Sequence, residues 1–388
     1  MQRITVTERP NLISVATDHG LEYNPGSGIT GWDETAYYQF TTGQIEDQFI
    51  GPVEEIERLC FEVVERVVAD ETLLSKLGIA EAYWDYIAES WRVGERNLYG
   101  RMDLTYDGST SPKLLEYNAD TPTALYETAV FQWEWLEQAA ELSFIPQHSD
   151  QFNEVHECIL RALPRIGIQG LAHFACNKEI EDDKGTLDYL EECAQESGLE
   201  TYSIAMSDIG SDEQGKFIDR EDRIITTMFK MYPWEWIMDE AFASHLPTCG
   251  VQFIEPPWKA ILSNKGLMPL LWEMFEGHQN LLPAFFDGDP AGNELIKSGS
   301  YVRKPLLSRQ GANIEIFENH EQLLSSDGPY GGGAYIVQAF QPLPDFNGKY
   351  PLVGCWLVAS KAAGLCIRED SSLITGVNSR VVPHLVLN

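Results

Sequence analysis

The chain has 388 residues, of which 44% are hydrophobic, so it is long and apolar enough for a globular core with two or three lobes rather than a disordered chain. It carries 60 acidic and 27 basic residues, and the formal net charge of −33 opposes binding to nucleic acid or to an anionic membrane surface. The same charge favours approach of a cationic substrate, with solubility or a salt-adapted host as the alternative explanation.

The sequence also favours a cytoplasmic protein. It contains no run of about 20 apolar residues, and its N-terminal stretch lacks an apolar signal core. The seven cysteines are scattered without a Cys-x-x-Cys pair, and an odd number argues against a disulfide framework. We therefore expect a reducing, bacterial-type cytosol, no transmembrane helix and no structural zinc.

Two scaffold helices are predicted before residue 95. Between residues 44 and 73, apolar side chains recur every three or four positions, at Ile45, Phe49, Val53, Ile56, Leu59, Val63 and Val67. Gly51-Pro52 falls inside this pattern, where it could break or kink the helix. A second helix is expected over residues 80–92, and neither helix carries recognisable chemistry.

Residues 101–118 predict a β-hairpin around an Asp-Gly turn. Side chains alternate between the faces of a strand, so Arg101 and Asp103 share a face, as do Glu116 and Asn118. Folding about the middle of the hairpin places Asp103 opposite Glu116. It places Arg101 opposite Asn118 in the same way, so the four polar groups project on one side.

Two carboxylates and an amide oxygen at one spot suit a hard cation such as Mg²⁺, which prefers oxygen ligands. Like charges this close resist joint ionisation unless a cation lies between them. Arg101 could neutralise the site or hold an anionic substrate. The alternative is an exposed hairpin face with a surface ion pair. Leu115 and Tyr117 are expected to point the other way, into a core.

Thr121-Pro122 predicts the start of the next helix, which would run to about residue 142. A hydroxyl residue is a common N-cap, and proline is favoured at the first helical position. A helix N-terminus is also a natural anion site. The threonine is therefore explained equally well by capping and by substrate contact.

Residues 150–250 predict an α/β region, because strand and helix patterns alternate there. The expected elements are a helix at 151–163, a strand at 173–176, a helix at 187–197 and a strand at 199–206. The acidic cluster Glu181-Asp182-Asp183 is placed before the second helix, and a solvated acidic loop is its simplest explanation.

The last part of the chain predicts a hairpin that could cover phosphates. Strands are expected at 301–305, 313–317, 334–340, 350–359 and 363–368, and a helix follows Lys265. The loop 306–312 contains a glycine and can expose backbone N–H groups to phosphate. No Walker motif occurs. Lys265 and Lys304, on separate elements, could clasp phosphates as point charges or could be solvated surface groups.

Taken together, these motifs resemble the glutathionylspermidine synthetase-like branch of the ATP-grasp ligases. The resemblance is carried, in the family's order, by Arg-Met-Asp at 101–103, Leu-Leu-Glu-Tyr-Asn-Ala-Asp-Thr-Pro-Thr at 114–123, Pro-Pro-Trp-Lys-Ala-Ile-Leu-Ser-Asn-Lys at 256–265, Tyr-Val-Arg-Lys-Pro at 301–305 and Ile-Arg-Glu-Asp at 367–370. It covers most of the chain and is closest to the shorter members, acid–amine ligases that lack the amidase domain of the bifunctional enzyme.

The resemblance implies an ATP-grasp fold of the α+β / α/β class, with a permuted order of parts, several mixed sheets and surrounding helices. It divides the chain into an N-terminal helical region with the metal-binding hairpin (1–149), an α/β substrate lobe (150–255) and a nucleotide-binding lobe (256–388).

The resemblance also implies residue roles. One or two Mg²⁺ ions would be held by Asp103, Glu116 and Asn118. ATP would be bound by Lys265, Lys304, Gly311, Gln338, Gln341 and Leu373. Arg101 and Arg368 would be catalytic, although a surface ion pair with Glu369 or Asp370 is the alternative for Arg368. The substrates would contact Arg101, Thr121, Asp182 and Asp183.

The implied function is an ATP-dependent carboxylate–amine ligase that forms an amide through an acyl phosphate, acting on a peptide-like carboxylate and an amine. A non-catalytic ATP- or polyamine-binding regulator on the same fold is the main alternative, and an acidic scaffold protein is a third. Two departures from the family pattern place glutathione and spermidine in doubt. Met231 stands where the family has a threonine that touches glutathione, and Arg380 stands where it has an aspartate that helps hold spermidine.

Overall fold

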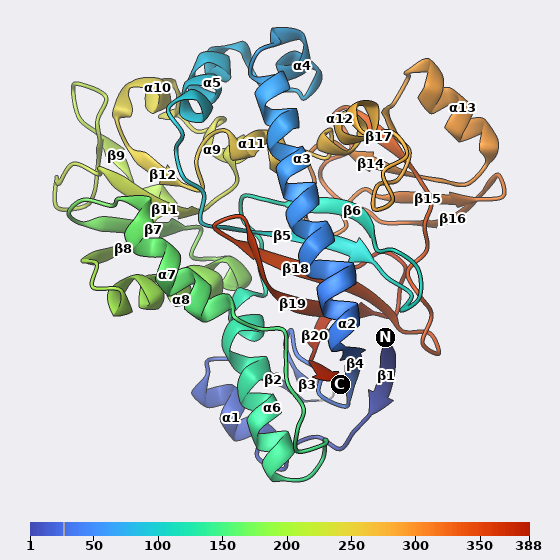
Figure 1. Ribbon diagram of the computed structural model, residues 1–388. Coiled ribbons are helices and arrows are strands. Elements are labelled where there is room, and N and C mark those ends of the chain that lie inside the picture. The colour runs from blue at the N-terminus through green and yellow to red at the C-terminus, as the bar shows by residue number, and fades with distance from the viewer. Residues whose placement is uncertain (26–27) are drawn as a thin grey trace.

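A five-stranded antiparallel sheet forms the centre of the molecule (Figure 1). The computed structural model describes residues 1–25 and 28–388. Across the central sheet the strands are β20 (Arg380–Val382), β19 (Lys361–Asp370), β18 (Tyr350–Val358), β5 (Tyr99–Thr105) and β6 (Lys113–Asn118). The C-terminal strands thus return to the hairpin near residue 110, because β18 pairs with β5.

A long helix crosses one face of this sheet (Figure 1). It consists of α2 (Thr42–Ile45), the π-helical turn η1 (Glu46–Ile50) and α3 (Gly51–Val67). Thr41 and Gln44 form a capping box at its start. The predicted apolar positions of α3 are buried, and Pro52 lies in its first turn without ending the helix.

A four-stranded parallel sheet builds the lobe on the left of Figure 1. Its order is β12 (Gln252–Ile254), β11 (Thr227–Met231), β7 (Ala172–Cys176) and β8 (Thr201–Ala205), with α7 (Val155–Ile166) and α8 (Glu181–Glu196) packed against it. The expected alternation of strand and helix is therefore observed. The start expected for the second helix was wrong: α8 begins at Glu181, so the acidic cluster forms its first turn, where the helix dipole favours carboxylates.

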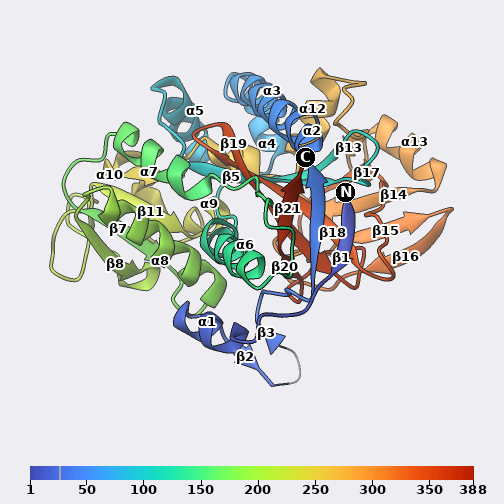
Figure 2. The same ribbon diagram turned by 60° about the horizontal axis from the view of Figure 1, so that its bottom comes forward.

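A second five-stranded antiparallel sheet lies on the opposite side (Figures 1 and 2). Its order is β13 (Ala284–Phe286), β17 (Tyr335–Ala339), β14 (Tyr301–Pro305), β15 (Glu315–Glu318) and β16 (Glu321–Ser325). The helices α12 (Leu267–Met274) and α13 (Pro290–Ser298) contact it. The strands expected between residues 301 and 340 are confirmed, and those expected after residue 350 are β18 and β19.

The two termini lie in one small sheet (Figures 1 and 2). Its central strand β4 (Ala36–Thr41) pairs antiparallel with β1 (Gln2–Thr5) and parallel with β21 (His384–Leu387). Nearby, the π-helical turn η3 (Glu127–Phe131) leads into α6 (Gln132–Glu141).

The predicted helix start at Thr121 was wrong. Residues 122–124 are not helical, and the first helical residue is Leu125. Ala124 has a φ of 67°, a left-handed conformation that an α-helix cannot include. Thr121 and Pro122 therefore belong to a loop.

The remaining elements are short. Two β-ribbons pair β2 (Tyr23–Asn24) with β3 (Gly28–Ile29) and β9 (Gly210–Ser211) with β10 (Phe217–Ile218). The other helices are α1 (Leu12–Asp18), α4 (Glu71–Lys76), η2 (Glu81–Tyr83), α5 (Trp84–Arg92), η4 (Met206–Asp208), α9 (Trp234–Ile237), η5 (Ala243–His245), α10 (Leu246–Cys249) and α11 (Lys259–Ser263). The second scaffold helix is confirmed as η2 and α5.

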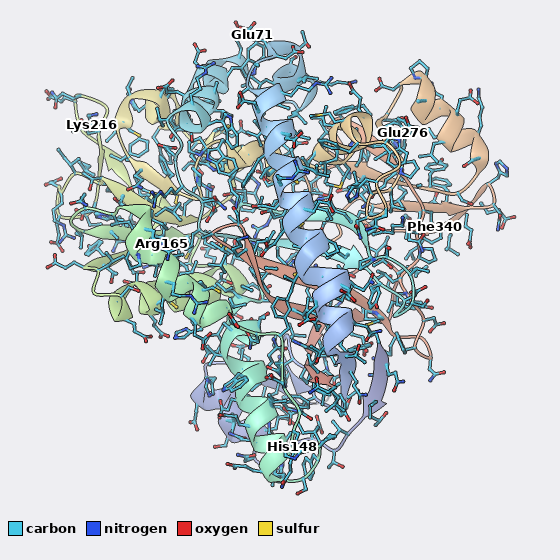
Figure 3. All side chains as sticks on the ribbon, viewed as in Figure 1. Glu71, His148, Arg165, Lys216, Glu276 and Phe340 are labelled. Atoms are coloured by element: carbon cyan, nitrogen blue, oxygen red, sulfur yellow. The ribbon has the colours of Figure 1, made fainter. Side chains whose placement is uncertain are left out.

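Within residues 1–25 and 28–388, no helix is both long and apolar enough to cross a bilayer. All seven cysteines are free thiols, as the scattered spacing predicted. Many charged side chains project from the periphery, as Glu71 does at the upper edge of Figure 3.

Candidate active site

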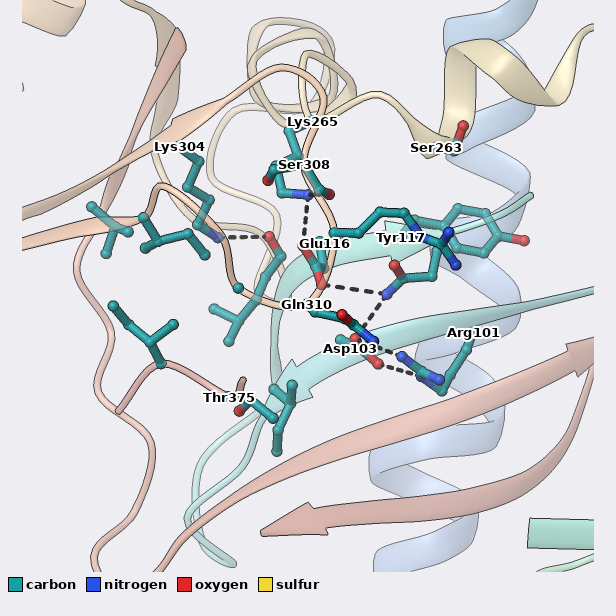
Figure 4. Close-up of a pocket in the computed structure, with 18 of the residues that line it drawn as sticks. Arg101, Asp103, Glu116, Tyr117, Ser263, Lys265, Lys304, Ser308, Gln310 and Thr375 are labelled. Carbon is teal, nitrogen blue, oxygen red and sulfur yellow. Dashed lines mark hydrogen bonds and ion pairs between the residues drawn. The ribbon is translucent and has the colours of Figure 1, made fainter. Parts of the chain in front are cut away.

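A cavity lies where the hairpin β5–β6 meets the second antiparallel sheet (Figure 4). Strands β14 and β17 supply one wall, and the loop 306–314 between β14 and β15 lies against it. The loop 121–123 and the start of α9 supply another wall. Segments from four distant parts of the chain therefore enclose one space.

The hairpin places its polar side chains as predicted. Asp103 is in register with Glu116, and Arg101 is in register with Asn118. All four line the cavity. Strand alternation places each pair of polar groups on one face, and a β-bulge between these pairs and the turn sets the register that brings all four together.

A β-bulge changes the expected orientation of Leu115. The register shifts between Asp103 and Leu104, so Leu115 is the extra residue on its strand. It lines the cavity instead of joining the core, so that expectation was wrong. Its carbonyl oxygen accepts a hydrogen bond from Lys304 Nζ at 3.1 Å. Tyr117 is buried, as predicted.

Asp103 is fully buried and is shared by two guanidinium groups. Arg101 Nε donates to its Oδ1 at 2.7 Å, and Arg368 Nη2 donates to its Oδ2. Burial lowers the pKa of Arg101, but Asp103 outweighs burial and holds that pKa above its ordinary value. Burial and the charge of Arg101 lower the pKa of Arg368. Two cations against one carboxylate leave this corner positive, which suits an anionic ligand.

On the second strand of the hairpin, the negative charge of Glu116 balances the neighbouring cations (Figure 4). Its Oε2 lies 3.1 Å from Lys265 Nζ. Burial alone would raise the pKa of Glu116, but the charges of Lys265, Lys304 and Arg368 outweigh it and lower that pKa well below its ordinary value. Glu116 is therefore an ionised carboxylate among three cations.

Gln338 fixes the position of Lys304. The Lys304 ammonium donates to Gln338 Oε1 at 2.9 Å, and the amide nitrogen of Gln338 donates to Leu114 O at 3.4 Å. Burial lowers the pKa of Lys304 to about 8, and Lys265 adds to this effect while Glu116 opposes it. Lys304 is thus a buried lysine whose charge responds to its surroundings.

The donor set of the hairpin fits Mg²⁺. Asn118 Nδ2 donates to Asp103 Oδ2 at 2.8 Å and to Glu116 Oε1 at 3.4 Å, which leaves its amide oxygen without a hydrogen bond in the part of the chain that the structure describes. Two carboxylates and a free amide oxygen are hard oxygen ligands. Across that same part of the chain, no group of three or more His, Cys, Asp or Glu side chains is placed to hold a metal ion.

The loop 306–314 packs tightly over the cavity. Lys265 Nζ donates to Ser308 O at 2.9 Å. Gly311 has a φ of 72°, and a Cβ there would lie 2.7 Å from Thr375 O. Only glycine permits this approach, so the loop brings its backbone close to the cavity.

The residues expected to bind the nucleotide all line the cavity: Lys265, Lys304, Gly311, Gln338, Gln341 and Leu373. The arginines expected to be catalytic, Arg101 and Arg368, line it as well. The structure thus brings together residues that are more than 260 positions apart in the sequence, as Asp103 and Arg368 are.

Comparison with known proteins identifies the family. The glutathionylspermidine synthase preATP-grasp family matches residues 3–387. The chain belongs to this family. A Haemophilus influenzae protein named "Putative acid–amine ligase" is 37% identical over 405 aligned residues, with 99% of each chain covered. These matches confirm the predicted family. They also confirm the predicted enzyme class, a C–N bond-forming ligase of the ATP-grasp type.

Longer members of the family are also similar. The Escherichia coli bifunctional glutathionylspermidine synthetase/amidase is 27% identical, and the alignment covers 92% of this chain but 60% of that protein. Trypanothione synthetase of Crithidia fasciculata is 26% identical, with 82% and 52% covered. Among solved structures, a glutathione synthetase-like effector of Globodera pallida superposes with a TM-score of 0.56 at 11% identity, with 98% of each chain covered. That likeness supports an ATP-grasp-like mixed α/β fold.

The family motif residue Thr121 lies in the cavity wall. Because it does not cap a helix, capping no longer explains why a hydroxyl residue stands there. The adjacent loop is held by Arg101, whose Nη1 donates to Thr123 O. Thr121 is therefore presented to the cavity by a loop tied to Arg101.

Asp182 and Asp183 contact the loop 306–314 from the first turn of α8. Asp183 is buried and accepts hydrogen bonds from Arg309 Nη2 at 2.8 Å and Nη1 at 3.2 Å. Asp182 is exposed and faces Gln310 Nε2 at 3.4 Å. In this structure both carboxylates hold the loop.

The sequence analysis gave no role to Arg309 or Glu235, both of which line the cavity. Arg309 lies inside the predicted phosphate-covering loop, so its position in the sequence could have indicated that it lies at the cavity. Glu235 ends Lys-Met-Tyr-Pro-Trp-Glu at 230–235, the family block in which Met231 departs from the pattern, but that block pointed to Met231 and not to the glutamate. The place of Glu235 in the cavity wall follows from the packing of this segment against the hairpin.

Proposed function

We propose that the protein is an ATP-dependent carboxylate–amine ligase that forms an amide bond through an acyl phosphate, on an ATP-grasp fold with a permuted order of parts. The observation that carries the proposal is the arrangement of two carboxylates, an amide, two lysines and two arginines around one cavity. The full-length similarity to an acid–amine ligase supports the same reaction class.

The first step would transfer the γ-phosphoryl group of ATP to the substrate carboxylate. Lys265 and Lys304 would hold the phosphates, and Arg101 and Arg368 would stabilise the charge that develops on the phosphoryl oxygens and the carboxylate. Asp103, Glu116 and Asn118 would hold one or two Mg²⁺ ions, which neutralise phosphate charge when bound. Gly311 and its loop would cover the phosphates, while Gln341 and Leu373 would line the nucleotide pocket.

The second step would be attack by an amine on the acyl phosphate, with release of phosphate. This chemistry needs fixed charges rather than a protein nucleophile. Thr121 and Arg101 would contact the carboxylate substrate, and Asp182 and Asp183 would lie near the amine.

We infer a small peptide-like acid and an amine as substrates, but a pair other than glutathione and spermidine. Met231 is fully buried against Tyr99, whose hydroxyl lies 3.6 Å from its sulfur, and it does not line the cavity, so this position brings no hydroxyl group to the site. A site without the expected polar group discriminates strongly against the ligand that needs it.

The test is a screen of carboxylate and amine pairs for ADP release, with mass spectrometry of the products. A ligase releases ADP only when both an acid and an amine are present, and the product mass equals their sum less one water. Nucleotide binding without acid- and amine-dependent ADP release would instead favour a non-catalytic regulator. Efficient formation of glutathionylspermidine would contradict the inferred substrate preference while leaving the ligase reaction intact.

A further inference from the structure

Among the described residues, the four carboxylates that line the cavity differ in whether another residue binds them. Asp103 is held by Arg101 and Arg368, and Glu116 is held by Lys265. Asp120 accepts a hydrogen bond from a buried lysine and another from a backbone N–H group. Glu235, the fourth, has no hydrogen bond or ion pair to another residue in the described part of the chain. It is the one cavity carboxylate without a partner from another residue in residues 1–25 and 28–388.

Glu235 is held in the cavity wall by the residue before it. The backbone N–H of Trp234 donates to Asp120 Oδ2 at 2.9 Å, and its indole N–H donates to Pro256 O at 3.1 Å. Lys230 donates to the other oxygen of Asp120. Trp234 is fully buried, so these contacts fix the backbone from which Glu235 projects.

The charged groups around Glu235 come from three directions. Asp120 lies at the end of the hairpin, Lys230 on β11 and Arg309 on the loop 306–314, and Tyr330 is also near. Burial raises the pKa of Glu235, and Asp120 adds to this effect while Arg309 and Lys230 oppose it. A carboxylate with a raised pKa is a better proton acceptor at neutral pH than an ordinary glutamate.

We propose that Glu235 receives the amine substrate: its carboxylate binds the ammonium group and takes up the proton that the nitrogen must lose before it attacks the acyl phosphate. This inference rests on the proposed ligase function. The nitrogen lone pair forms the C–N bond, the C–O bond to the phosphoryl group breaks, and its electron pair leaves with phosphate. The first proton passes from the ammonium group to a Glu235 carboxylate oxygen and frees this lone pair, and the second passes from the nitrogen to the departing phosphate as the amide forms.

Neighbouring carboxylates are less suited to this role. Asp183 is held by both terminal nitrogens of Arg309, and Asp120 is held by Lys230. Asp182 is exposed and does not line the cavity. A protonated amine at Glu235 would meet a carboxylate without having to displace a protein cation.

Hydroxylamine separates the two parts of this proposal. It is unprotonated at neutral pH and needs no base, so it reports formation of the acyl phosphate as a coloured hydroxamate. Glutathione and a panel of glycine-terminated peptides serve as acids with Mg-ATP. For each acid that yields hydroxamate, amide formation is then measured with spermidine, putrescine and other protonated amines.

The measured quantity is the rate with a protonated amine divided by the rate with hydroxylamine. We expect Glu235→Gln to lower this ratio by roughly 100-fold, in the range of general-base contributions. Glu235→Asp keeps the carboxylate, so its ratio should lie between those of the wild type and Glu235→Gln. In the wild type the rate with the protonated amine should be nearly constant around neutral pH and decrease at acidic pH as Glu235 takes up a proton, whereas in Glu235→Gln it should rise steadily with pH, in proportion to the unprotonated fraction of the amine.

Asp239→Asn is the matched control, because Asp239 is exposed, lies close in sequence and loses the same charge. Its ratio should equal that of the wild type. An unchanged ratio in Glu235→Gln would overturn the role of Glu235. So would a wild type that forms hydroxamate but uses no protonated amine, which would leave the ligase function standing. A wild type that yields neither ADP nor hydroxamate with any acid would overturn the proposed function itself.

Discussion

Glu116 carries the negative charge on which several cations of the cavity depend. Glu116→Gln removes that charge with almost no change in volume and leaves Lys265, Lys304 and Arg368 less well compensated. We expect ATP turnover to fall by about 100-fold or more, since a lost metal ligand and disturbed charges act on the same step. ADP release measures the effect, and circular dichroism checks the fold. Glu318→Gln, at an exposed position on β15, should leave turnover unchanged. Activity within a few-fold of the wild type would remove Glu116 from the site.

Lys304 should make nucleotide affinity depend on pH. Burial lowers its pKa to about 8, so the free protein carries an ammonium group below that pH and a neutral amine above it. Phosphate favours the ammonium form, so ATP binding raises this pKa, and affinity is highest below pH 8 and falls as pH rises through 8. Titration calorimetry on both sides of pH 8 measures the fall, which is at most about tenfold per pH unit for one proton. Lys304→Met should bind more weakly and lose this dependence; a pH dependence that persists in it would assign the effect to another group.

The loop 306–314 is the element that joins the nucleotide side of the cavity to the parallel-sheet lobe. Its link to α8 is the pair between Arg309 and the buried Asp183. Asp183→Asn would remove the charge and leave Arg309 without its partner, which favours open positions of the loop. Because only the closed loop covers the nucleotide, we expect apparent ATP affinity to fall by about tenfold. Faster amide hydrogen exchange in residues 306–314 would identify the loop as the cause.

Asp188→Asn provides the control for this loop. Asp188 lies on the same helix but forms an exposed pair with Lys184, and exposed pairs contribute about 0–1 kcal/mol. Neither ATP affinity nor exchange in the loop should change. An Asp183→Asn protein with unaltered exchange in the loop would show that its other contacts, such as Lys265 with Ser308, are enough to hold it.

At the scale of elements, local sequence patterns predicted the features that depend on neighbouring residues in the chain. The predicted pairing of Asp103 with Glu116 is observed, although the bulge at Leu115 is what sets this register. The bulge at Leu115 and the late helix start after Thr121 could not be read from the sequence. Both depend on tertiary contacts: Lys304 binds the carbonyl of the bulged residue, and Arg101 binds the loop carbonyl of Thr123.

At the scale of the whole molecule, the sequence could not show which distant strands pair. β18 joins the hairpin strand β5, and this pairing carries Arg368 on the adjacent β19 to Asp103. The family motifs identified which residues belong to the site. They could not show which of these residues contact one another. Glu235 stayed hidden, since its availability follows from the ion pairs that occupy every other carboxylate lining the cavity in the described chain.

Because the cavity walls come from segments far apart in the chain, only the fully folded molecule can bind Mg-ATP tightly. A ligand that binds only the folded state stabilises it by about 2.7 kcal/mol at a concentration of 100 times its Kd. For a chain of this size we expect a rise in melting temperature of roughly 1–3 °C. Differential scanning fluorimetry with millimolar Mg-ATP measures it. The shift should shrink when a chelator removes the metal and should shrink in Glu116→Gln, because the hairpin carboxylates are assigned to the metal. No shift in the wild type would count against the nucleotide site, whereas an equal shift in Glu116→Gln would mean that the lysines bind the nucleotide without the metal.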